Sequence, residues 1–98
     1  MSEILIHHNG VFNFYNTVSD GPRFVSGLTL EQVRIFTKEE YGNQGLKNLS
    51  ERIKRAIEKG TSSYDHDSLD ETIQLNRAGI NEEHLSSEEF IKLFLTII

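Results

Sequence analysis

The chain has 98 residues, a net charge of −5 and 37% hydrophobic residues, which suits one domain, expected over residues 1–98. A chain of this length buries about two thirds of its unfolded surface, so a core without disulfide or metal staples is feasible. The negative charge argues against nonspecific nucleic-acid binding, because phosphate neutralisation needs a basic surface. The absence of cysteine removes disulfides, thiolate catalysis and the usual zinc sites.

No targeting or membrane signal is recognised in the sequence. The N-terminal residues lack the basic region and the long apolar core of a signal peptide. No apolar run approaches the roughly twenty residues that a membrane span needs. We therefore expect a cytoplasmic protein with no membrane partner.

Two β-rich runs, Ile4–His8 and Val11–Val18, flank the dipeptide Asn9-Gly10. This dipeptide predicts a type I′ hairpin turn, which needs a positive φ at both central residues. The two-residue loop places His8 opposite Val11 and makes both hairpin faces apolar. One face carries Leu5, His7, Phe12 and Phe14, and the other carries Ile4, Ile6, Val11 and Tyr15. We expect helices on one face and either the C-terminal tail or a partner on the other.

A second turn signal, Asp20-Gly21-Pro22, predicts a third antiparallel strand over Arg23–Ser26. Residues 28–98 read as helical, and Ser/Thr-x-x-Glu/Gln capping boxes mark three helix starts, at Thr29–Gln32, Ser68–Glu71 and Ser86–Glu89. Apolar periodicity and glycines predict helices over Leu30–Tyr41, about Gln44 to Lys59, Leu69–Ala78, and Ser87 to about Thr96. The expected fold is α+β, with an N-terminal antiparallel β-hairpin or three-stranded meander (residues 1–27) packed against three to four short α-helices.

Charge is segregated along the chain. Residues 43–60 carry five basic and two acidic side chains, a net of +3, whereas residues 65–89 carry eight acidic side chains and one arginine, a net of −7. One interpretation is two solvated helix faces that attract each other within the fold. The other is a bipolar surface that orients a partner.

The end of the basic helix and the polar loop after it form a candidate ligand site. Its residues are Arg55, Lys59, Thr61, Ser62, Ser63 and Tyr64, with Arg77 contributing from nearby. Cations and hydroxyls together can hold a nucleotide-like anion, although a phosphate loop normally precedes a helix and this loop follows one. The alternative for Arg77, the one cation of the acidic segment, is an ion pair with Asp70 or Glu82.

The four histidines do not show the spacing of metal ligands. His7 and His8 are adjacent on a strand and point to opposite faces, and His66 and His84 lie in loops. Asp65-His66-Asp67 has no nucleophile motif beside it. We predict no metal, no cofactor and no catalytic residue, and we read His7 as a partly buried sheet residue opposite Phe12.

The C-terminal segment is apolar almost all round, which indicates burial on most sides or a contact surface. Helical spacing predicts a core-facing stripe of Phe90, Leu93, Phe94 and Ile97. The interface residues are predicted to be Phe90, Ile91, Leu95 and Ile98. A homodimer, centred on this helix or on the outer sheet face, is the simplest way to cover them.

The first functional hypothesis is a small, non-catalytic intracellular binding module that occupies a protein partner, as a regulator or inhibitor does. The alternative is a binder that sequesters or senses a nucleotide-like anion, and an enzyme is the third possibility. A deep polar pocket with converging basic groups would favour the small-molecule binder. A flat apolar patch that includes the C-terminal helix would favour the protein partner.

Overall fold

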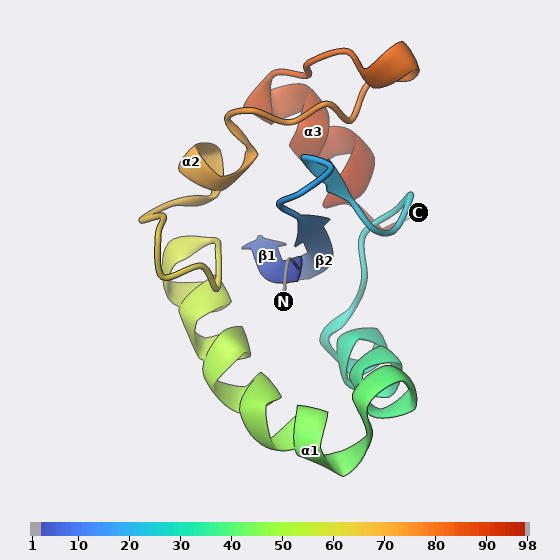
Figure 1. Ribbon diagram of the computed structural model, residues 1–98, viewed down its shortest axis with the longest axis vertical. Helices are drawn as coiled ribbons and strands as arrows, with labels where there is room; N and C mark the ends of the chain where they lie inside the picture. The colour runs from blue at the N-terminus through green and yellow to red at the C-terminus, as the bar shows by residue number, and fades with distance from the viewer. Residues whose placement is uncertain (1–2, 98) are drawn as a thin grey trace.

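A computed structural model describes residues 3–97 and has an α+β fold (Figure 1). The sheet is antiparallel with the order β1-β2-β3, and its strands are β1 (Glu3–His8), β2 (Val11–Asn16) and β3 (Gly21–Pro22). The helices are α1 (Leu30–Lys59), α2 (Leu69–Ile73) and α3 (Ser87–Phe94), with a 3₁₀ turn, η1 (Ile80–Glu82), before the last. Within residues 3–97, no helix combines the length and apolar character needed to cross a bilayer.

The predicted hairpin and its register are confirmed. His8 lies opposite Val11, and the ladder continues in step to Glu3 opposite Asn16. Asn9 has a φ of 50° and Gly10 a φ of 82°, as the type I′ turn requires.

A Gly10→Val substitution should lower the free energy of unfolding by about 1–3 kcal/mol, because a β-branched residue is strained at positive φ. A Cβ at Gly10 would meet no atom within 4 Å, so the loss would come from the backbone alone. Urea denaturation measures it, with Gly21→Val as the control, since Gly21 is equally open and lacks a positive φ. Equal losses in the two variants would contradict a strained turn.

The third strand lies at Gly21–Pro22, and the prediction that it spans Arg23–Ser26 is wrong. Arg23 N still donates to Phe14 O at 2.8 Å, and from Phe24 on the buried side chain of Asn13 takes the place of strand pairing. Its Oδ1 accepts from Phe24 N at 3.2 Å, and its Nδ2 donates to Phe24 O at 3.0 Å. The segment therefore bonds to a side chain of β2 and leaves the regular ladder.

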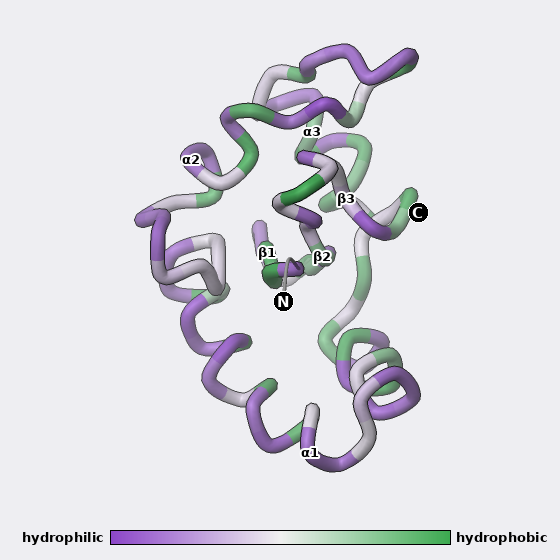
Figure 2. Tube along the Cα trace, in the orientation of Figure 1, coloured by the Kyte–Doolittle hydropathy of each residue, from purple (hydrophilic) through white to green (hydrophobic). Residues whose placement is uncertain are grey.

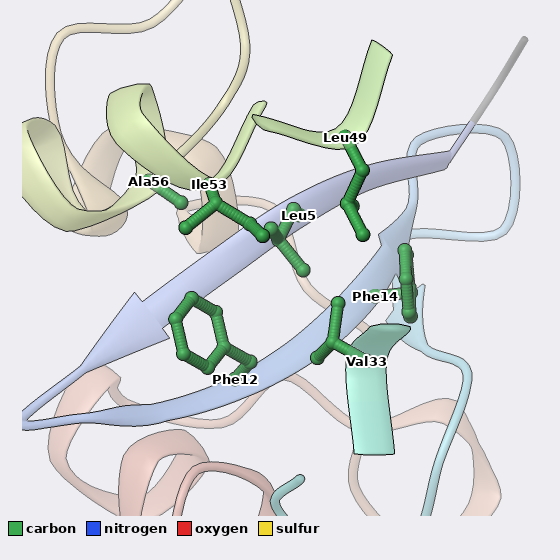
Figure 3. Packing of buried hydrophobic residues seen from close by; sticks show 7 residues of the cluster. All are labelled: Leu5, Phe12, Phe14, Val33, Leu49, Ile53 and Ala56. Carbon is green, nitrogen blue, oxygen red and sulfur yellow. The ribbon is translucent and has the colours of Figure 1, made fainter. Parts of the chain in front are cut away.

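Both faces of the sheet are buried within the chain. α1 covers one face, and Figure 3 shows the seven residues of this cluster: Leu5, Phe12, Phe14, Val33, Leu49, Ile53 and Ala56. α2, α3 and the tail cover the other face, where the cluster consists of Ile6, Tyr15, Leu69, Ile73, Phe90 and Leu95. Helices were expected on one face and either the C-terminal tail or a partner on the other; on the second face the structure has the tail together with α2 and α3. Most residues along α1 are hydrophilic (Figure 2).

The two helices predicted over residues 30–59 run together as α1, so the described chain has three α-helices and not four. The break predicted at Gly42 is present as a kink, where the backbone leaves helical geometry (φ 68°, ψ −161°). A Cβ at Gly45 would lie 2.5 Å from the Cβ of Tyr41, so the glycine lets the two halves of α1 approach. The result is a bent helix that opens toward the sheet (Figure 1).

Two of the three predicted capping boxes are complete, at Thr29 and at Ser86. The hydroxyl of Ser68 accepts from Glu71 N at 3.2 Å, but the Glu71 carboxylate accepts from Asp67 N and does not close the box. α2 ends at Ile73, short of the predicted Ala78.

The early end of α2 follows from Asn76, which is buried. Its Nδ2 donates to Ile73 O and to Leu85 O, both at 2.8 Å, and its Oδ1 accepts from Leu85 N at 3.1 Å. These bonds tie the chain into a loop, because an amide that serves backbone groups competes with helix continuation.

The core-facing stripe predicted for the last helix is wrong in part. Leu93 is 51% exposed and Ile97 is 48% exposed, whereas Leu95 is 2% exposed. α3 stops at Phe94, two residues before the predicted end, and the non-helical φ of −122° at Leu95 turns that side chain toward the sheet. Helical spacing does not apply beyond this point.

Of the predicted interface residues, Phe90 and Leu95 are therefore buried inside a single chain, in the second cluster. Ile91 is partly buried against the same cluster, and Ile98 lies outside the described residues. The tail itself covers the outer sheet face for which a partner chain was considered. The homodimer stays a prediction, but the buried side chains of Phe90 and Leu95 are not available to form its centre.

Candidate functional site

A cavity of about 540 Å³ lies between the two halves of α1, the start of β1 and the loop after α1. We call it the fork cavity. It is lined by Glu3, Ile4, Thr37, Tyr41, Gln44, Gly45, Asn48, Arg52, Arg55, Ser62, Ser63, Tyr64 and Asp65. The kink at Gly42 sets its shape, because the kink directs the two halves of α1 along different walls.

The loop that forms one wall of the cavity is fixed to the edge of the sheet. Gly60 ends α1 with a φ of 89°, and its carbonyl accepts from His7 N at 3.0 Å. Ser62 then pairs with Leu5 in both directions, since Ser62 N donates to Leu5 O at 2.8 Å and Leu5 N donates to Ser62 Oγ at 2.9 Å. The polar loop recognised in the sequence is thus a short addition to the sheet.

Only part of the predicted ligand site comes together in the cavity. Four of its seven residues line the wall: Arg55, Ser62, Ser63 and Tyr64. Lys59 donates to the carbonyls of Ser63 and His66, both at 3.1 Å, and so holds the loop. Thr61 is buried, and its hydroxyl accepts from Ser63 N. Arg77 forms an ion pair with Glu82 at 3.1 Å, one of the two partners predicted for it.

Arg55 lines the cavity from the second half of α1. Its Nε donates to Ser62 O at 3.0 Å, and its guanidinium lies 4.1 Å from the ring centroid of Tyr64. The carboxylate of Glu51 is 3.7 Å away but 81% exposed. An ion pair of this kind contributes little, because solvent and salt screen it, and Arg55 keeps capacity for a second anion.

Arg52 is the residue that sequence reasoning missed. It is half-buried, its Nη2 donates to Glu3 O at 3.2 Å, and its guanidinium lies 5.8 Å from the ring centroid of Phe14. Among residues 3–97, no carboxylate lies within ion-pair distance of it. Burial lowers the pKa of Arg52 from its ordinary value, yet arginine keeps its charge at neutral pH.

A signal for Arg52 was present in the sequence. Leu49, Ile53 and Ala56 have the spacing i, i+4 and i+7 of one helix face, and all three are buried. Arg52 is the i+3 position of the same stripe, so its side chain is directed inward with the apolar ones. Buried charges are normally paired, and a charge in an apolar stripe is therefore informative.

Two carboxylates complete the charged lining of the cavity, Glu3 and Asp65. Glu3 is held by Arg23 at 3.2 Å, and Arg23 also contacts Glu40 at 3.4 Å and lies 4.6 Å from the ring centroid of Phe36. Asp65 is exposed, and its backbone N donates to Ser63 Oγ at 3.1 Å. Glu3 is thus neutralised from outside the cavity, whereas no cation in the described part of the chain forms an ion pair with Asp65.

The histidines serve local structure. His7 packs 4.8 Å from the ring of Phe12, as a partly buried sheet residue, and its Nε2 accepts from Gly10 N at 2.9 Å. Burial, with help from His8, lowers the pKa of His7, which suits this acceptor role. Within the described part of the chain, no three His, Asp or Glu side chains are placed to share a metal ion.

Comparison of the chain with family models, with curated proteins and with solved structures finds no match. Guanidinium groups present planar, forked donors that fit a carboxylate or a phosphate. In the fork cavity two such groups stand beside tyrosine rings and hydroxyls, an arrangement suited to holding an organic anion.

Proposed function

We propose that this domain is a non-catalytic binding module that holds a small organic anion in the fork cavity. The observation that carries the proposal is Arg52, a half-buried cation that lines the cavity without a carboxylate partner among residues 3–97. An anionic ligand would supply that partner. A volume of about 540 Å³ falls within the range of small-molecule sites.

This proposal follows the second functional hypothesis from the sequence, a binder of a nucleotide-like anion. Of the deep polar pocket with basic groups that would favour this hypothesis, the structure has a cavity lined by Arg52 and Arg55, and these two arginines support a small-molecule binder over a protein partner. The apolar C-terminal helix, on which the partner hypothesis relied, packs on the sheet of its own chain. A regulator or inhibitor that occupies a protein partner stays a prediction, and no surface described above favours it.

Thermal denaturation with a panel of organic anions tests the proposal, for example benzoate, indole-3-acetate and adenosine monophosphate, with inorganic phosphate added. A ligand at 100 times its dissociation constant adds about 2.7 kcal/mol to the stability of the folded state, so the melting temperature should rise. In Arg52→Gln the rise should disappear, and in Arg52→Lys it should be retained in part.

Lys54→Gln is the matched control. It makes the same charge change two residues away on α1, at an exposed position that does not line the cavity. The rise should survive in this variant. Because each rise is measured against the same variant without ligand, a lower basal stability of Arg52→Gln does not affect the result. A flat response across the panel, or equal responses of Arg52→Gln and Lys54→Gln, would refute the proposed function.

A further inference from the structure

The charged residues of the fork cavity carry information about the ligand beyond its negative charge. Two arginines, Arg52 and Arg55, face two carboxylates, Glu3 and Asp65, so the lining has a formal charge of zero. A di- or triphosphate would place several negative charges beside the carboxylate of Asp65, which is not paired with a cation among the described residues, and like charges at short range repel. The balance favours a ligand with one anionic group.

The same lining offers a place for a positive group. The charge of Glu3 is already taken up by Arg23, at 3.2 Å. Asp65 lines the cavity and has no cation within ion-pair distance among the described residues. Arg52 and Asp65 are therefore two opposite charges on one cavity, neither of which forms an ion pair among residues 3–97, and they match the two charges of a zwitterion.

The remaining lining suits an aromatic body. Tyr41 and Tyr64 contribute rings from α1 and from the loop, and Ile4 and Gly45 contribute apolar surface from β1 and from the helix fork. Tyr64 is 80% exposed and backed by Arg55, so its free face is available for stacking.

We propose that the ligand is a free aromatic α-amino acid. Its carboxylate pairs with Arg52, its ammonium pairs with Asp65, and its ring lies among the tyrosines. This inference rests on the proposed function, because it specifies the chemistry of an anion bound in the same cavity. It is narrower, since it requires the ammonium as well as the carboxylate.

Isothermal titration of the full chain with L-phenylalanine and L-tryptophan tests the inference. Three related compounds each lack one of the recognised groups. N-acetyl-L-phenylalanine lacks the ammonium, as does the C-terminal residue of a peptide. L-phenylalaninamide lacks the carboxylate, and L-alanine lacks the aromatic ring. Each of the three should bind at least about tenfold more weakly than L-phenylalanine, because each lacks a charge or its aromatic surface. Asp65→Asn should weaken the binding of L-phenylalanine by a similar factor and leave the affinity for N-acetyl-L-phenylalanine unchanged.

Asp67→Asn is the matched control, since this exposed carboxylate lies two residues further on and does not line the cavity. It should bind L-phenylalanine as the unmodified chain does. Equal or tighter binding of N-acetyl-L-phenylalanine or adenosine monophosphate, or no binding of either amino acid, would overturn the inference and leave the anion site standing. Equal binding of L-phenylalaninamide would show that the carboxylate is not recognised and would overturn the proposed function as well.

Discussion

An Asn13→Ala variant is expected to lose about 4 kcal/mol of unfolding free energy, since several buried or partly buried backbone groups lose their partner at once. The side chain is fully buried in the middle of β2. Its Nδ2 donates to Phe24 O and, at 2.9 Å, to Phe94 O at the end of α3. Its Oδ1 accepts from Phe24 N and, at 2.8 Å, from Phe14 N. One amide thus joins the central strand, the segment after β3 and the last helix.

Urea denaturation measures this loss as a lower midpoint. Asn16→Ala provides the comparison, because Asn16 also accepts two backbone bonds, from Val18 N at 2.8 Å and from Ser19 N at 3.1 Å, but in an exposed turn. Water replaces an acceptor there, so a loss of about 1 kcal/mol or less is expected. If the two variants were equally stable, the buried amide would not have the central role that its contacts indicate.

Leu95→Ala should lower the free energy of unfolding by about 2–4 kcal/mol. Leu93→Ala, on the same segment, should lower it by less than about 1 kcal/mol. The difference follows from exposure, which is 2% for Leu95 and 51% for Leu93. Leu95 lies in the cluster with Ile6, Tyr15 and Phe90, so its removal leaves a cavity under the sheet. Thermal or urea unfolding of the two variants gives the comparison directly.

The reverse order would restore the helical stripe expected from the sequence, in which Leu93 faces the core. Equal, small losses would mean that the tail does not close the second face of the sheet. That result would make a second chain the natural cover for Ile6 and Tyr15, and would revive the predicted homodimer.

The parts of the fold that the sequence predicted correctly depend on neighbours in the chain. The Asn9-Gly10 turn has two residues and therefore determines the register of the whole hairpin. The predicted break at Gly42, which is a kink within one helix, and the caps at Thr29 and Ser86 likewise depend on a few adjacent residues.

The parts that were missed depend on polar side chains that bond across long separations. Asn13 meets Phe94, 81 positions away, and replaces the strand expected after β3. Asn76 ends α2 by bonding to Leu85. The pattern of apolar and polar residues cannot predict such hydrogen bonds, because they form only after the fold has brought distant segments together.

The candidate site was predicted in part for the same reason. The sequence grouped residues that are consecutive, such as Ser62 to Tyr64, and these do share the fork cavity. It did not join them to Arg52 or to Tyr41, which the bend of α1 and the edge of β1 bring to the same place. The basic residues of α1 had been treated as one group, whereas burial distinguishes Arg52 from exposed Lys54.

The attachment of Gly60–Ser62 to β1 has a consequence for the protein at high concentration. An uncovered outer strand offers free N–H and C=O groups to a strand of another molecule, and this is a common start of aggregation. Here the amides of Leu5 and His7 on that edge are occupied by the loop after α1. Leu28 closes part of the opposite edge through paired bonds with Phe12. These bonds protect the sheet from strand-to-strand polymerisation. Detachment of the Gly60–Ser62 segment would leave the hairpin intact but expose unpaired backbone groups on β1 to other molecules.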